Sequence, residues 1–195
     1  MLDYDEPARI AALRGLAPRL RVAWALLCAE RALPGYRRAC AKTGRGNPFL
    51  AECLAERLWF DVAGDAMTSE ELEAARTRAE ALLDDEDEND AAAALVFAFD
   101  ARATGDPLEA AWAGRRLYDL ADALAQRDLC GERSAATWTG ADEARILGHP
   151  RVQRELARQE RDLRELASLA DDFRDALERM KVRSASEAAE LLAND

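Results

Sequence analysis

The chain has 195 residues, of which 49% are hydrophobic and 33% charged, and its formal net charge is −11. Alanine, leucine, arginine and glutamate dominate and favour helices, whereas the β-branched residues that favour strands are scarce. The negative charge argues against nucleic acid and anionic membrane surfaces as partners, because both are themselves anionic. A basic protein partner would be attracted by the same charge.

The length suits a single domain over residues 1–195. No N-terminal stretch has the layout of a secretory signal, and no window approaches the length of about 18 uninterrupted apolar residues that a membrane helix needs. The four cysteines form no Cys-x-x-Cys pair and suit small buried apolar side chains in a reducing compartment. We therefore expect a cytoplasmic protein.

Apolar residues recur at intervals of three and four along almost the whole chain, which is the helical period. In the first part of the chain we expect one helix over about residues 6–16 and a second over 19–33. Pro34 can open a short third helix, because proline at a first helical position loses no needed donor. A further helix runs from Pro48 to about Gly64.

Thr68 begins a helix over 68–83 with a capping box, in which Thr and a Glu three residues later bond each other's backbone. The most apolar segment, 91–105, is expected to be a central helix. Asp106 then caps a helix that reaches about Cys130.

The longest amphipathic segment begins at Pro150. Its seam consists of two mainly apolar series with a seven-residue repeat: Leu156, Leu163, Ala170 and Leu177, then Val152, Gln159, Leu166, Phe173 and Met180. This pattern predicts a helix of roughly thirty residues in a bundle or coiled coil. The seam can be buried within one chain or in a homodimer. Ser184 and Glu187 are expected to cap a short terminal helix.

The sequence thus predicts an all-α protein, a single compact bundle of about seven to nine helices with one long C-terminal helix.

The glycine-rich segment 33–48 poses a choice between a phosphate loop and a helix stop. A phosphate loop needs Gly-x-x-x-x-Gly-Lys-Ser/Thr after a strand, and here Gly44 and Gly46 follow a predicted helix. We favour a left-handed helix cap at Gly44. Arg38 and Lys42 share one helix face, so they form a basic patch that is either solvated or an anion site.

Other chemistries have weak support. The acidic run 84–90 lacks the glycine and glutamate of an EF-hand loop, so it is expected to be a solvated loop. One histidine, His149, is too few for a histidine-ligated di-iron or zinc site, and we expect no metal and no cofactor. Gln159 interrupts the C-terminal seam, where it either fixes helix register or binds a ligand.

Two blocks of the sequence resemble a known family. The first reads AERALPGY (29–36), TGRGN (43–47) and then LW (58–59), and it is similar to C-E-R-x-x-P-N-Y, T-G-F-G-D and hydrophobic-W. The second, PRVQRELARQ (150–159), is similar to P-x-V-x-x-E-x-x-x-Q. These patterns belong to the YjaG-like bacterial proteins, the family of domain of unknown function 416. Ala29, Gly35, Arg45 and Asn47 depart from the family pattern.

The resemblance implies a compact all-helical protein and no established reaction, substrate or cofactor, with a loose link to histidine-kinase signalling. Its matched positions mark either a shared surface or a shared way of turning between helices. The candidate binding residues are Glu30, Arg31, Tyr36, Arg38, Lys42, Thr43 and Gln159.

We expect a non-enzymatic protein that binds another protein, in signalling or elsewhere, and that binds neither nucleic acid nor membrane. Two other functions stay open. A small acidic helical chain also suits an immunity protein that neutralises a basic toxin. An enzyme would need a pocket in which Asp100, Glu155 or a cysteine meets other polar groups.

Overall fold

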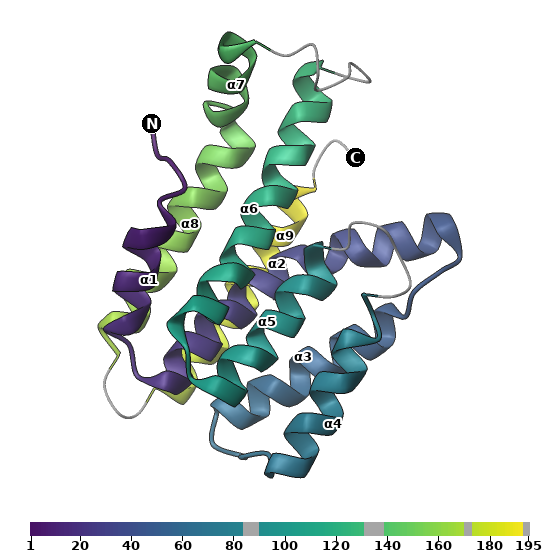
Figure 1. Ribbon diagram of the computed structural model, residues 1–195, viewed down its shortest axis with the longest axis vertical. Coiled ribbons are helices and arrows are strands. Elements are labelled where there is room, and N and C mark those ends of the chain that lie inside the picture. Colours follow the sequence, from purple (N-terminus) through teal and green to yellow (C-terminus); the bar gives the residue numbers. More distant parts are fainter. Residues whose placement is uncertain (84–89, 131–138, 170–172, 193–195) are drawn as a thin grey trace.

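Helices make up all the regular structure in the computed structural model, which describes residues 1–83, 90–130, 139–169 and 173–192 (Figure 1). The predicted all-α class is therefore confirmed over these residues, which hold nine helices. Most of the acidic run and most of the loop before residue 140 lie outside the described residues. The helices are α1 (Glu6–Arg14), α2 (Pro18–Thr43), α3 (Pro48–Val62), α4 (Ser69–Glu80), α5 (Asp90–Thr104), α6 (Pro107–Cys130), α7 (Gly140–Leu147), α8 (Pro150–Ala167) and α9 (Arg174–Leu191).

Helix α2 is the centre of the bundle. It packs against α3, α5, α6, α8 and α9, with α1 and α8 along one side of the molecule and α3 and α4 along the other (Figure 1). Every residue from Val22 to Ala29 is at most 1% exposed, so this part of the helix is covered on all sides. A helix that is apolar all round is expected to be buried in this way.

Pro34 does not open a new helix, which corrects the sequence-based expectation. It lies inside α2, which runs unbroken for 26 residues. A proline in a helix interior removes one backbone hydrogen bond and costs about 3 kcal/mol. Packing on several neighbouring helices supplies far more stabilisation than local propensity removes, so α2 continues through this position.

The prediction of a single long C-terminal helix was also wrong. The structure has two helices of 18 residues each, and α8 ends at the Ser168 cap. Ion pairs join Glu165 to Arg183 and Arg161 to Glu187, so the residue numbers rise along α8 as they fall along α9. The two helices are therefore antiparallel, and both reach α2. The short terminal helix expected at Ser184 is instead part of α9.

The capping signals at Thr68, Asp106 and Gly44 are confirmed. Both hydrogen bonds of the Thr68 capping box are formed at the start of α4. Asp106 accepts a hydrogen bond from the Leu108 N–H at 2.9 Å, at the start of α6. At the end of α2, Gly44 adopts a left-handed conformation with φ 71° and its N–H bonds to the Cys40 carbonyl at 2.8 Å. The helix-stop interpretation of the glycine-rich segment thus agrees with the structure.

The packing of α6 against Trp24 of α2 depends on Gly114. A Cβ atom built on this residue would lie 2.3 Å from Cη2 and 2.9 Å from Cζ3 of the fully buried Trp24. Gly114→Ala should therefore destabilise the protein by about 1–3 kcal/mol through overpacking, although alanine is the better helix former. Chemical unfolding measures this change.

Gly140→Ala is the matched control, because a Cβ there meets nothing within 4 Å. We expect it to leave stability unchanged or slightly raised. A Gly114→Ala variant as stable as the wild type would contradict the packing described above.

Candidate functional site

A charged cluster lies in the middle of the bundle, centred on Arg31 of α2. The guanidinium is fully buried, and its Nε and Nη2 donate to the two carboxylate oxygens of Glu155 at 3.1 and 3.0 Å. Its Nη1 donates to Asp162 at 2.8 Å and to the Ser184 hydroxyl at 3.2 Å. Each nitrogen of Arg31 thus has a partner, and the partners come from α8 and α9.

A second layer of ion pairs surrounds this centre and extends to the surface. Asp162 also accepts hydrogen bonds from Arg161 at 2.8 Å and from Arg183 at 3.0 Å. Glu187 pairs with Arg161 at 2.6 Å and lies 3.8 Å from Arg158. The carboxylates of Asp162 and Glu187 therefore each contact more than one arginine. The resulting network connects α8 to α9, and residues of both helices contact Arg31.

Gln159 joins the same cluster. Its side-chain amide donates to Glu155 and to the Gly114 carbonyl, both at 3.1 Å, and its backbone carbonyl accepts from the Trp24 indole at 3.3 Å. The structure therefore brings together Arg31 and Gln159, two candidates from sequence that are 128 positions apart, through the shared carboxylate of Glu155. These bonds link α2, α6 and α8.

Burial and nearby charges shift the pKa values of several groups in the cluster, and burial also raises that of Glu155. Burial alone would lower the pKa of Arg31, but the acidic side chains of Glu155 and Asp162 outweigh it and raise this pKa, so the guanidinium stays charged. Burial raises the pKa of the Cys28 thiol well above its usual value, so it stays protonated and a poor nucleophile. Glu155 and Cys28 thus meet at Arg31 without access to solvent, whereas Asp100 pairs with Arg76 elsewhere.

The glycine-rich turn is held by Tyr36, which is 3% exposed. Its hydroxyl accepts a hydrogen bond from the Asn47 N–H at 3.0 Å, and the Asn47 side chain in turn caps α3. Gly46 has φ 80°, and a Cβ there would lie 2.7 Å from both the Tyr36 hydroxyl and the Cys40 sulfur. The turn therefore needs glycine for its conformation and for its close contact with Tyr36.

The remaining candidates lie apart from the charged cluster. Arg38 donates to the Leu192 carbonyl at 3.0 Å, at the C-terminal end of α9, where a cation is favoured. The Thr43 hydroxyl donates to the Ala39 carbonyl at 3.0 Å within α2. Lys42 is exposed. Of the predicted basic patch, Arg38 therefore binds the C-terminal end of α9, and Lys42 is exposed to solvent.

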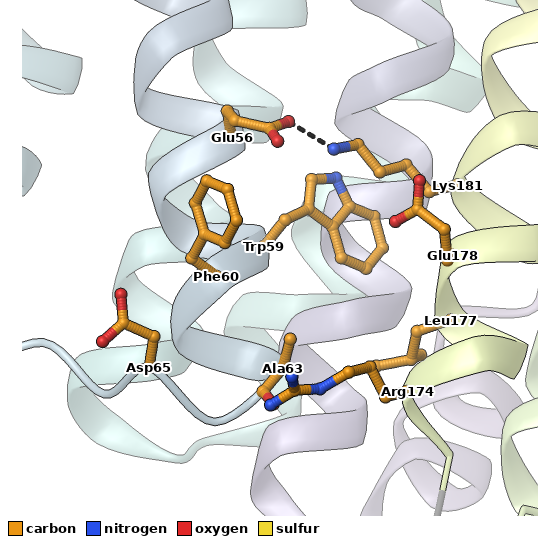
Figure 2. A pocket seen from close by; sticks show the side chains of 9 residues that line it. All are labelled: Glu56, Trp59, Phe60, Ala63, Asp65, Arg174, Leu177, Glu178 and Lys181. Atoms are coloured by element: carbon orange, nitrogen blue, oxygen red, sulfur yellow. Dashed lines mark hydrogen bonds and ion pairs between the residues drawn. The ribbon is translucent and has the colours of Figure 1, made fainter.

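A groove between α3 and α9 lies close to the candidate residue Glu30, which bonds one of the side chains that line it (Figure 2). Its cavity of about 200 Å³ has the largely buried Trp59 and Leu177 in its lining. Figure 2 shows the Trp59 indole between the two helices, with the Glu56–Lys181 ion pair at one end of the groove. At the other end Arg174 donates to the backbone carbonyl of Ala63 at 2.8 Å.

Glu30, a candidate from sequence, lies behind this groove. Its carboxylate accepts a hydrogen bond from the Trp59 indole N–H at 2.9 Å, which fixes the ring. Burial raises the pKa of Glu30, and the Trp59 N–H and the charge of Lys181 oppose this rise, while Glu56 and Glu52 add to it. The carboxyl therefore holds its proton to a higher pH than an exposed glutamate does.

An exposed stripe follows the outer face of α3. Phe49, Cys53, Glu56 and Phe60 recur at spacings of four, three and four, and Phe49 and Phe60 are 75% and 52% exposed. Cys53 therefore differs from the buried cysteines that the sequence analysis expected, whereas Cys28 and Cys40 are buried. Two exposed phenylalanines on one helix face need an explanation, because such side chains favour burial.

Sequence reasoning missed several of these residues. Asp162 lies off the apolar seam, and Ser184 and Glu187 resemble a capping box, so their role in a buried network left no distinct signal. The stripe on α3 left a signal, because Phe49 and Phe60 lie on the polar side of an otherwise clear helical pattern.

No group of three or more histidine, cysteine, aspartate or glutamate side chains within the described ranges is arranged to hold a metal ion. None of the helices in these ranges combines the length and the hydrophobicity that a bilayer-spanning segment needs.

Comparison with solved structures relates this architecture to a known fold. A crystal structure of a DUF416 family protein from Shewanella baltica OS155 superposes with a TM-score of 0.69. The match covers 90% of this chain and 93% of that chain at 14% sequence identity. The chain has the fold of this family. The resemblance to domain of unknown function 416 is thus confirmed at the level of the fold, whereas no family model and no curated protein matched the sequence.

Arg31→Met should destabilise the protein by about 3–5 kcal/mol, because it leaves Glu155 and Asp162 buried without their shared cation. Chemical unfolding measures the loss. Arg37→Met on the same helix is the control: its exposed pair with Glu52 should contribute less than about 1 kcal/mol. Equal losses from the two variants would contradict a structural role for the buried cluster.

Glu30→Gln should become more stable relative to the wild type as the pH rises above 4.5, the ordinary value of a glutamate pKa. A carboxyl with a raised pKa binds its proton more tightly in the folded state. The stability it contributes is present below the unfolded pKa and is lost as the pH rises through the folded pKa. Glutamine keeps an acceptor for Trp59 and has no proton to lose.

Urea unfolding of both proteins between about pH 4.5 and pH 8 tests this expectation. Each unit by which the folded pKa exceeds the unfolded one corresponds to about 1.4 kcal/mol. A stability difference that stays constant or shrinks with rising pH would show that burial does not control this carboxyl.

Proposed function

We propose that this protein acts by binding another protein, without catalysis, and that the groove between α3 and α9 is its docking surface. The shared fold and the two sequence blocks support membership in the family of domain of unknown function 416, which offers no activity to transfer. The free thiols of Cys28, Cys40 and Cys53 suit the reducing cytoplasm.

The observation that carries the proposal is the exposure of apolar side chains on the two helices that form the groove. Three of the five most exposed large apolar residues in the described chain lie on its two helices: Phe49 and Phe60 on α3, and Val182 on α9. Solvent-exposed apolar side chains that gather at a concave surface are typical of protein interaction sites. Phe60 itself lines the cavity.

The size of the cavity suits one anchoring side chain of a partner. Its volume of about 200 Å³ is below the range of about 300–1,000 Å³ that is usual for small-molecule sites. The Trp59 ring is already fixed by Glu30, so a side chain that enters meets a preorganised apolar wall.

Charge selects the kind of partner. Glu56 and Lys181 neutralise each other across the groove, Arg174 is engaged with the Ala63 carbonyl, and Asp65 lies 3.7 Å from Arg57. Glu178 is an exposed carboxylate on the rim, and the chain as a whole carries −11. The occupant that fits is an amphipathic helical segment of a basic protein, with a large apolar residue facing Trp59 and a lysine or arginine near Glu178.

Affinity capture from a lysate of the source organism at low salt tests the proposal. The baits are wild type, Phe60→Glu, Glu178→Lys and the control Glu73→Lys, which makes the same charge change at an exposed position on α4. We expect a basic partner on wild type and Glu73→Lys. Both groove variants should bind it at least tenfold more weakly, equivalent to about 1.4 kcal/mol.

The captured protein is then divided into synthetic peptides, and fluorescence polarisation measures their affinity for each bait. Binding by a basic amphipathic peptide with the same order of affinities supports the proposal. Capture that yields no specific protein, or a partner retained equally by all four baits, contradicts it.

A further inference from the structure

A second cavity lies on the side of the bundle formed by α1 and α8. It measures about 290 Å³ and is lined by residues of the N-terminal segment, α1 and α8, among them Arg9. Arg9 is 5% exposed, and its Nε and Nη1 are buried without a hydrogen-bond partner among the described residues. Its guanidinium instead stacks over the Tyr4 ring, 4.7 Å from the centroid.

An arginine in this state differs from the other buried guanidinium groups of the protein. Arg31 is bonded to Glu155 and Asp162, and Arg151 lies 2.9 Å from Asp128. No described carboxylate lies within 4 Å of Arg9. Burial of a cation without a counter-charge is unfavourable, so this position suits an anionic group supplied from outside the chain.

The rest of the lining restricts which anion can enter. Three carboxylates, those of Asp3, Asp5 and Glu160, surround the cavity, and Arg164 adds a second cation. A phosphate with two negative charges would be repelled by three carboxylates. A molecule with one carboxylate and one ammonium group satisfies both signs, since its carboxylate can pair with Arg9 and its ammonium can face an acidic side chain.

Among the three acids, Glu160 is the one available to an ammonium group. Asp5 accepts a hydrogen bond from the Ala8 N–H as the cap of α1, and Asp3 accepts one from the Tyr4 N–H. The side chain of Glu160 is half-buried and has no hydrogen bond or ion pair with the described residues. Arg9 and Glu160 thus provide two unsatisfied charges of opposite sign, one from each helix.

The cavity volume of about 290 Å³ limits the size of the ligand, and the apolar part of the lining favours an aliphatic side chain. Ala8, Ala12 and Leu163 provide methyl and methylene surface between the charged groups. We propose that this cavity binds a free α-amino acid with a small or aliphatic side chain. Its carboxylate contacts Arg9, its ammonium group contacts Glu160, and its side chain packs against Leu163.

Isothermal titration calorimetry on the full chain tests the proposal with the individual proteinogenic amino acids at millimolar concentration. Acetate, methylamine and inorganic phosphate are the comparison ligands. We expect measurable binding of at least one small or aliphatic amino acid. Its N-acetyl and carboxamide derivatives should each bind at least tenfold more weakly, because each lacks one of the two charges.

Variants then assign the contacts. Arg9→Gln and Glu160→Gln should each weaken binding of that amino acid at least tenfold, whereas Arg14→Gln, which removes an exposed arginine from the same helix, should leave it unchanged. Phe60→Glu should also leave it unchanged, so that this cavity is tested separately from the α3–α9 groove. If Arg9→Gln does not fold, the blocked derivatives still test both charges on the wild type.

Three results would overturn the proposal. One is that no amino acid binds. Another is that phosphate or acetate binds as tightly as the best amino acid. The third is that the blocked derivatives bind as well as the free amino acid, since the two opposite charges would then have no role.

Discussion

The buried charge of Arg31 constrains the rest of the bundle. A guanidinium can lie at the centre of a protein only if its hydrogen bonds and its charge are satisfied there. Glu155, Asp162 and Ser184 meet this requirement from α8 and α9, at 2.8–3.2 Å. Apolar packing alone would tolerate small shifts of one helix along another, whereas these bonds fix the register of α8 and α9 on α2.

This constraint also explains what the family resemblance describes. Arg31 belongs to the first of the two matching sequence blocks, and Glu155 and Gln159 belong to the second. These residues meet in the core, and Glu30 and Tyr36 of the first block hold Trp59 and the turn before α3. In this chain the named residues of the two blocks therefore take part in joining and packing the helices.

Much of the fold could be predicted from the sequence, because helix periodicity and capping are local properties. The helix starts at Thr68 and Asp106 and the stop at Gly44 follow from a few neighbouring residues. The helix start predicted at Pro34 was wrong, because tertiary packing of α2 outweighs the local cost of a proline inside a helix. The break after α8 was missed because the seven-residue repeat continues across it, and a repeat records only which positions are apolar. The charged cluster could not be predicted, since it joins residues more than 120 positions apart.

The contrast between Arg31 and Arg9 separates structure from binding in this protein. Both side chains lie on the inner face of a helix and both are at least 95% buried, yet the chain supplies carboxylates to only one of them. A charge satisfied within the fold holds helices together. A charge left without a partner beside a cavity, with an unpaired carboxylate across it, lowers stability unless a molecule of matching charge enters. The same reasoning applies to the α3–α9 groove, where Phe60 remains exposed beside a fixed tryptophan. The surfaces at which the chain leaves its own groups unsatisfied are therefore the ones where binding can recover free energy.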